Sequence, residues 1–319
     1  MTDSLPCFDD VLAAAACISP HAHVTPVLQS ATLDALAGAN LHFKAEHLQR
    51  TGAFKFRGAC NAVWGLSDDE ARAGVVTHSS GNHGAALALA ALTRGIPCHV
   101  VVPEGAVATK LASIQRYGAT LHPCAATMAA REARCAQLQA QTGAMLVHPF
   151  TNARVIAGQG TAALELLNRT DGLDVLVVPV GGGGLAAGTA ITAAALAPGC
   201  RVVLAEPEGA ADAARSLATG ERVVDFVPDT VCDGLRAALG EPNFALLRHH
   251  QVEVITVDDA ATVQAMRLYW QTAKQLVEPS SALVLAAVLG NPARFAGQRV
   301  GLILSGGNVD LDAFPWSAA

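Results

Sequence analysis

The chain carries little charge and has no long basic, acidic or apolar run. Charged residues make up 15% of its 319 residues, and the formal net charge is −6. This balance argues against nucleic acid or an anionic membrane surface as the main partner. The longest apolar stretch, residues 185–198, is too short and too rich in small residues to span a bilayer. We therefore expect a protein that binds neither nucleic acid nor membranes.

Cysteine pairs and export signals are also missing. The eight cysteines are scattered, without a CxxC pair or a cluster with metal-ligand spacing. This distribution is typical of buried, reduced thiols in the cytosol. The first ten residues, MTDSLPCFDD, contain no apolar segment of the kind found in signal peptides. We expect a cytoplasmic protein, whose length allows two packed cores or one large core with an inserted lobe.

Lysine is scarce where arginine is common. Only four of the 21 lysines and arginines are lysines, and one of them, Lys55, lies between two phenylalanines in GAFKFRGA (52–59). Burial disfavours the ammonium form, so a lysine in this setting can serve as an amine nucleophile or form a Schiff base. The alternative is a lysine whose aliphatic stem only covers part of the core, and these eight residues alone favour that alternative.

What the chain does contain is a repeated order of strand, loop and helix. We expect helices at 85–95, 109–118, 126–142, 155–168, 185–197 and about 260–277. Near-continuous apolar strands alternate with them and predict an α/β fold of two lobes. Each lobe is expected to hold an open, twisted parallel sheet with helices on both faces. We assign residues 67–149 to an inserted small domain, and residues 1–66 and 150–319 to a large domain.

Three predicted strands end in loops suited to a ligand: SSGNHG (79–84), GGGGL (181–185) and SGGN (305–308). Ligands of parallel sheets bind at the carboxyl ends of strands. Four glycines followed by a helix can form a cup of N–H groups for phosphate, although a tight turn with nothing bound is the alternative. GGGGLAAG fits a dinucleotide fingerprint poorly, and no GK[ST] of a P-loop follows. One phosphate together with an imine-forming lysine indicates pyridoxal 5'-phosphate.

The whole pattern resembles the fold-type II pyridoxal-phosphate enzymes, which share the fold of the tryptophan synthase β subunit. The branch is that of serine racemase, threonine dehydratase and hydroxyaspartate dehydratase. The motifs follow the family order along nearly the whole chain: TPV (25–27), FKFRGA (54–59), HSSGNHG (78–84), VIAGQGT (155–161), VVPVGGGGL (177–185), AEP (205–207) and LSGGNVD (304–310).

The resemblance implies how the cofactor would be held. Lys55 would form the imine with the cofactor and later act as a base at the substrate Cα. Phe54 would pack beside the cofactor ring, unless it is an ordinary core residue, and Asn82 would bond the pyridoxal 3-hydroxyl. The phosphate would be held by the backbone N–H groups of Gly181, Gly182, Gly183 and Gly184.

The same resemblance implies contacts to the substrate. Ser79, Asn82 and His83 would line the loop that grips the substrate carboxylate, although a structural role for His83 is equally open. Ser80 would lie opposite Lys55 and act as a second base that permits racemisation, unless it only turns the strand end. Ser305 would face the pyridine nitrogen. A hydroxyl cannot keep that nitrogen protonated, which suits β-elimination better than transamination.

A divalent-cation site is also implied, formed by Glu206, the carbonyl of Ala210, and Asp212. Two carboxylates, a carbonyl and water suit Mg²⁺ or Ca²⁺, with Mn²⁺ as a further candidate. The spacing alone is weak, because surface carboxylates are common. We expect the ion to be structural or activating, and the resemblance further implies a homodimer.

Two arginines mark where the chain differs from its branch. In DGLRAALG (233–240), Arg236 and two alanines stand where serine racemases carry a serine near the substrate carboxylate. This difference argues against simple serine racemase activity. Arg236, or Arg131 of the predicted helix at 126–142, could pair with a second carboxylate of the substrate. Each could equally be a solvated surface arginine.

We therefore predict a pyridoxal-phosphate-dependent ammonia-lyase, a dehydratase that converts a 3-hydroxy amino acid to a 2-keto acid and ammonia. Threonine, serine, 3-hydroxyaspartate and phenylserine are all open as substrates. The alternatives are an amino-acid racemase or a bifunctional racemase–dehydratase, an enzyme of β-replacement, and a non-catalytic sensor of the cofactor or of an amino acid.

Overall fold

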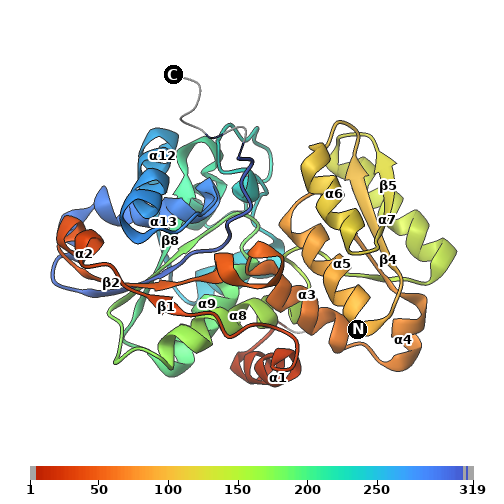
Figure 1. Cartoon of the computed structure of the whole chain (residues 1–319), viewed down its shortest axis with the longest axis horizontal. Helices are drawn as coiled ribbons and strands as arrows, with labels where there is room; N and C mark the ends of the chain where they lie inside the picture. The colour runs from red at the N-terminus through yellow and green to blue at the C-terminus, as the bar shows by residue number, and fades with distance from the viewer. Residues whose placement is uncertain (1–4, 312–313, 315–319) are drawn as a thin grey trace.

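The computed structural model describes residues 5–311 and 314 and shows two lobes side by side (Figure 1). The strands are β1 (Val27–Leu28), β2 (Asn40–Lys44), β3 (Val75–His78), β4 (Cys98–Pro103), β5 (Thr120–Cys124), β6 (Met145–Leu146), β7 (Val175–Pro179), β8 (Arg201–Pro207), β9 (Glu253–Val257) and β10 (Arg299–Ile303).

Helices connect and cover these strands. They are α1 (Phe8–Ile18), α2 (Ala31–Ala37), α3 (Lys55–Trp64), α4 (Asp68–Ala73), α5 (Asn82–Arg94), α6 (Ala108–Arg116), α7 (Met128–Thr142), α8 (Ala153–Leu167), α9 (Gly184–Leu196), α10 (Asp212–Thr219), α11 (Glu241–His249), α12 (Asp259–Leu268), α13 (Pro279–Leu289) and α14 (Pro292–Phe295). Short 3₁₀ turns lie at η1 (Glu46–Leu48), η2 (Arg50–Gly52), η3 (Glu208–Ala210) and η4 (Asp233–Leu235), and η5 (Tyr269–Ala273) is a π-helical turn.

The strands form two separate sheets. One has six strands in the order β1-β2-β10-β7-β8-β9, and the other has four in the order β5-β4-β3-β6. Every neighbouring pair is parallel except β1 and β2. The predicted α/β fold with parallel sheets covered on both faces is confirmed.

The larger sheet is buried on both faces because successive residues of its central strands point to opposite sides. Val175 and Val177 of β7 pack in the core formed with α2, α12 and α13. Leu176 and Val178 point the other way, into the core formed with α8 and α9. This arrangement explains why the strands read as continuous apolar runs.

Helix α3 joins the two lobes. Phe56 and Cys60 of α3 are fully buried in the same apolar core as Leu87 of α5 and Val100 of β4 in the four-stranded lobe. The four-stranded sheet takes its strands from residues 75–146 alone. The domain boundaries at 66/67 and 149/150 stay predictions.

The predicted helix at about 260–277 is wrong at its end. Helix α12 stops at Leu268, the π-helical turn η5 follows, and Lys274 ends it with a left-handed φ of 56°. Gly95 and Gly118, at φ 74° and 77°, follow α5 and α6 as expected. Five of the eight cysteines are buried, and all eight thiols are free. No helix in the described residues is long and apolar enough to cross a membrane.

Candidate active site

Lys55 is the first residue of α3 and lies at the junction of the two lobes. Its Nζ donates a hydrogen bond to the carbonyl oxygen of Pro149 at 3.1 Å and lies 5.1 Å from the centre of the Phe54 ring. Burial lowers the pKa of Lys55 to about 8, although the carboxylate of Glu278 acts in the opposite direction. The positive end of α3 also disfavours an ammonium at this position. The side chain can therefore be a neutral amine near physiological pH.

The four glycines connect β7 to the first turn of α9, where no side chains fit. A Cβ on Gly181 would lie 2.8 Å from the Cα of Leu235, and one on Gly182 would lie 2.4 Å from the ring of Phe150. Gly183 has a left-handed φ of 89°. The loop thus presents bare backbone at a helix N-terminus, where N–H groups and the helix dipole bind phosphate.

The side-chain amide of Asn243 is bonded to this glycine loop. Asn243 Nδ2 donates to the carbonyl oxygens of Gly182 at 2.5 Å and of Phe150 at 2.8 Å. Neither Asn243 nor Phe150 was found from the sequence. Phe150 is an apolar residue after a proline, and Asn243 is an asparagine in a helix. Neither pattern gives a local signal, because both residues act on parts of the chain that are far away in sequence.

Asn82, Glu278 and Asn308 form a polar cluster that links the two lobes. Asn82 Nδ2 donates to both carboxylate oxygens of Glu278, at 3.0 and 3.1 Å, and Asn82 Oδ1 accepts from Asn308 Nδ2 at 2.9 Å. The backbone N–H of Asn308 donates to Glu278 at 3.2 Å. Burial raises the pKa of Glu278 to about 7, and the nearby Asp233 carboxylate adds to that rise.

The serines predicted for the site lie at two strand ends. The N–H of Phe54 donates to the carbonyl oxygen of Ser305 at 2.9 Å, so the end of β10 is bonded to the segment that carries Lys55. In the loop after β3, Ser79 Oγ accepts from the N–H of Gly81 at 3.4 Å. Ser80 is half-buried, and within the described residues its hydroxyl has no hydrogen-bond partner.

His83 is held by the backbone of its own lobe. Its Nε2 donates to the carbonyl oxygen of Val147 at 3.2 Å, while its buried Nδ1 has no partner among the described residues. Burial, followed by the charge of Lys55, lowers its pKa well below the usual value. A neutral His83 that orders the loop agrees with the structural role left open above.

The two arginines proposed for a second carboxylate differ in their surroundings. Arg236 is exposed, and its Nε and Nη2 donate to the carbonyl oxygen of Thr230, at 3.2 and 2.5 Å. Arg131 is half-buried, and its buried Nε has no partner among the described residues. Burial lowers the pKa of His78 at the end of β3; the charge of Glu132 opposes this shift, and that of Arg131 adds to it. The two guanidinium groups thus differ: that of Arg236 is bonded to the backbone, whereas Arg131 has a buried nitrogen with no partner within the described residues.

Glu206 and Asp212 are buried together near the N-terminus of α10. Glu206 accepts from the N–H groups of Ala213 at 2.6 Å and Ala214 at 2.8 Å. Asp212 accepts from the N–H of Leu239 at 2.8 Å, and its buried Oδ1 has no partner within the described residues. Burial raises the pKa of Glu206 to about 8 and that of Asp212 to about 6. An orphaned carboxylate oxygen beside a second buried carboxyl group fits a divalent cation.

The lysine and the glycine loop together fit a cofactor that combines an aldehyde with a phosphate. A low-pKa amine and a phosphate cup without side chains are what pyridoxal phosphate requires of a protein. This defines the class of the protein as a pyridoxal-phosphate enzyme.

Comparison with known proteins agrees. The chain belongs to the pyridoxal-phosphate dependent enzymes, since the family model of that description matches residues 18–306. It is 49% identical to the beta-hydroxyaspartate dehydratase of Paracoccus denitrificans (strain Pd 1222), across 98% of this chain and 99% of that protein. It is 46% identical to the serine racemase of Arabidopsis thaliana, across 92% of this chain and 90% of the relative. Among solved structures, maize serine racemase matches with a TM-score of 0.94 at 43% identity, covering 97% of this chain and 95% of that one.

Proposed function

We propose that this enzyme is an ammonia-lyase that converts 3-hydroxyaspartate to the corresponding 2-oxo dicarboxylic acid and ammonia. The observation that carries the proposal is the low-pKa amine of Lys55, which donates to the carbonyl oxygen of Pro149, next to the Phe150 ring that lies against Gly182. The similarity to a beta-hydroxyaspartate dehydratase along nearly the whole chain supports the choice of reaction. Water leaves from Cα and Cβ, and hydrolysis of the resulting enamine returns one water and releases ammonia.

The cofactor, when bound, supplies an electron sink that acidifies the Cα–H bond. The N–H groups of Gly181 to Gly184 would hold its phosphate, and Lys55 Nζ would hold its aldehyde carbon. Lys55 Nζ then takes the α-proton, which its lowered pKa allows near neutral pH. Ser305 would face the ring nitrogen with a neutral hydroxyl, and the loop of Ser79 and Asn82 would bind the α-carboxylate of the substrate.

The second carboxylate of the substrate is assigned to Arg131. A buried guanidinium nitrogen without a partner is a costly feature that an anionic ligand would relieve. Arg236 is the weaker candidate because the carbonyl of Thr230 already occupies its guanidinium. Replacing Arg131 with Met should therefore raise KM for 3-hydroxyaspartate much more than for serine.

A second candidate function is racemisation, alone or combined with elimination. The half-buried Ser80 with an unpartnered hydroxyl supports it, as does the similarity to serine racemases. A base on the second face of Cα would allow a proton to return with inverted configuration. Ser80 and Lys55 would then share the two faces.

We also propose Mg²⁺ or a similar divalent ion at Glu206, Ala210 and Asp212, supported by the orphaned Asp212 oxygen. A homodimer is proposed from the resemblance to the serine racemase branch, and light scattering of the purified protein tests it. The eight free thiols support a cytoplasmic enzyme, which cell fractionation tests.

The test is release of 2-oxo acid from cofactor-loaded enzyme with Mg²⁺ over all stereoisomers of 3-hydroxyaspartate, serine, threonine and phenylserine. A preference for 3-hydroxyaspartate supports the proposal. A preference for another of these amino acids supports the lyase reaction but contradicts 3-hydroxyaspartate as the substrate. If none of them yields 2-oxo acid but the configuration of serine or aspartate is inverted, the enzyme is a racemase.

A further inference from the structure

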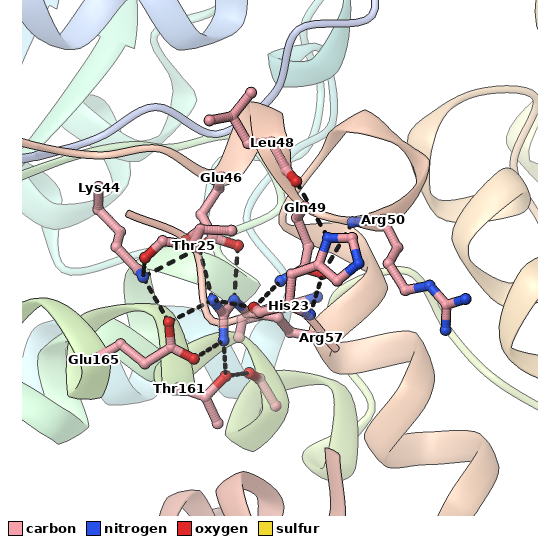
Figure 2. A network of polar contacts seen from close by, with 12 residues as sticks. His23, Thr25, Lys44, Glu46, Leu48, Gln49, Arg50, Arg57, Thr161 and Glu165 are labelled. Atoms are coloured by element: carbon pink, nitrogen blue, oxygen red, sulfur yellow. Dashed lines mark hydrogen bonds and ion pairs between the residues drawn. The ribbon is translucent and has the colours of Figure 1, made fainter. Parts of the chain in front are cut away.

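A buried network of four charged side chains joins the end of β2, the turn η1 and the helices α3 and α8 (Figure 2). Lys44, Glu46 and Arg57 have fully buried side chains, and that of Glu165 is 20% exposed. The network holds two positive and two negative groups. None of these residues belongs to the site described above, yet Arg57 follows Lys55 by two positions on α3.

Arg57 is the centre of the network and bonds to two carboxylates at once. Its Nε and Nη2 donate to Glu46 at 2.7 and 2.8 Å, and its Nη1 and Nη2 donate to Glu165 at 2.7 and 2.9 Å. Nη1 also donates to Thr161 Oγ1 at 3.2 Å. Glu165 and Thr161 lie on α8, and Glu46 lies in η1. One guanidinium thus fixes the first turn of α3 against two other elements, with the paired geometry that only arginine provides.

The backbones of α3 and α8 touch beside this network. A Cβ on Gly158 would lie 2.6 Å from the Cα of Gly58, and the N–H of Gly58 donates to Gln159 Oε1 at 3.0 Å. Glycine contacts allow two helices to come close, but they restrict sliding only weakly. Directional bonds restrict sliding more strongly, and Arg57 supplies most of those between α3 and α8, beside the bonds of Gly58 to Gln159 and of Asn61 to Arg154.

The same two helices carry the parts that meet in the active site. Lys55 begins α3, and the segment before α8 supplies the carbonyl of Pro149, which accepts from Lys55 Nζ, and the ring of Phe150, which lies against Gly182. A shift of α3 along α8 would therefore move the lysine amine relative to the phosphate cup. A displacement of about 1 Å at a reacting group can cost about 100-fold in rate.

We propose that Arg57 is a positioning residue for Lys55, which holds the amine in register with the glycine loop by fastening α3 to α8. The catalytic part of this inference rests on the proposed lyase function. Its geometric part concerns only how the bound cofactor is held, and it can be tested without any turnover.

The experiment compares Arg57→Lys with Arg94→Lys in the holoenzyme. Both changes keep the charge and remove the guanidinium fork. Arg94 lies on α5 and donates to the carbonyl oxygens of Val63 and Leu66, at the opposite end of α3. The two variants thus loosen the same helix at its two ends, and only Arg57→Lys loosens the end that carries Lys55.

The readouts are visible circular dichroism of the bound cofactor, which reports the asymmetry of its surroundings, and kcat measured apart from KM. Arg57→Lys should alter the dichroism band and lower kcat by about 10- to 100-fold. Arg94→Lys should change neither the dichroism band nor kcat by more than about twofold relative to the parent enzyme. This should hold even if it lowers the melting temperature as much as Arg57→Lys does. Equal dichroism and equal kcat in Arg57→Lys and the parent would overturn the proposal, as would equal losses in the two variants.

Glu165→Gln covers the case in which Arg57→Lys does not fold. It keeps the shape of the side chain and one acceptor for Arg57 while it removes the charge. A changed dichroism band in this variant supports the proposal, and an unchanged band overturns it. If the parent enzyme releases no 2-oxo acid from any hydroxy amino acid, the proposed function fails, and the dichroism comparison still decides the role of Arg57.

Discussion

The side-chain amide of Asn82 donates to both carboxylate oxygens of Glu278, at 3.0 and 3.1 Å, across 196 positions of sequence. Asn82 begins α5 beside the four-stranded sheet, and Glu278 precedes α13 beside the six-stranded sheet. This contact joins the two lobes. Since it uses the charged form of a carboxyl group, it depends on pH.

The first prediction concerns that pH dependence. Burial raises the pKa of Glu278 to about 7, so the carboxylate that binds Asn82 forms as the pH rises through 7. We expect kcat/KM to rise over the same range, and Glu278→Gln to remove this limb of the profile. Asp233→Asn removes a repelling charge, so it should move the limb to lower pH. If the rise of kcat/KM occurs at the same pH in both variants as in the parent, Glu278 is not the group that titrates.

The second prediction concerns Lys55. Lys55→Ala should lower turnover by about 1000-fold or more, because both the attachment point of the cofactor and the base at Cα are lost. Borohydride reduction of the holoenzyme followed by peptide mass spectrometry should place the cofactor on Lys55 in the parent. Near-normal turnover in the variant would refute the role. Lys274→Ala, which removes an exposed lysine bonded to Gln271, is the control and should leave turnover unchanged.

The third prediction concerns the glycine loop. Gly182→Ala places a methyl group against the Phe150 ring, where a Cβ would lie 2.4 Å away. We expect overpacking of about 1–3 kcal/mol and weaker binding of pyridoxal phosphate. Gly199→Ala is the matched control, since a Cβ there meets nothing within 4 Å. Fluorescence titration should show weaker cofactor binding in Gly182→Ala than in Gly199→Ala. Equal affinities would show that the loop accommodates the methyl group, which would contradict the prediction.

The fourth prediction concerns the divalent cation. The folded-state pKa values of Glu206 and Asp212, about 8 and 6, lie above their ordinary values. Their ionisation therefore costs stability as the pH rises through this range. A bound cation reverses the cost, so Mg²⁺ should raise the melting temperature more at pH 8 than at pH 5.5, by about 3 °C or more at saturation.

Variants test the same site. Asp212→Asn should abolish the gain from Mg²⁺, while Asp69→Asn, at an exposed carboxylate of α4, should keep it. A gain that is independent of pH, or one that survives in Asp212→Asn, would place the ion elsewhere.

The fifth prediction separates elimination from racemisation. Ser80→Ala removes the half-buried hydroxyl after β3, so inversion at Cα should fall at least about 100-fold. Elimination from the enantiomer that Lys55 deprotonates should fall by less than about threefold. Chiral chromatography and 2-oxo acid assays measure the two reactions in parallel, and equal losses in both would give Ser80 a general structural role.

Much of the fold and part of the site follow from local sequence. The role of Lys55 followed from the family motifs along the whole chain, because the eight residues around it alone favoured a lysine that only covers part of the core. The continuous apolar run of Val175 to Val178 and the glycines at the end of β7 act through their immediate neighbours. Their chemistry can therefore be read before the chain is folded. The end of α12 could not be read in this way, since a π-helical turn and a left-handed Lys274 interrupt a sequence that still looks helical.

By itself, the sequence determined the parallel α/β architecture, the cofactor class and the identity of the lysine. Only the tertiary structure decided that Glu278 holds Asn82, that Phe150 lies under the phosphate cup and that Arg57 fastens α3 to α8. The reason is physical: these contacts join residues that lie tens to hundreds of positions apart, and their energies arise from burial and geometry that exist only once the helices and sheets have packed.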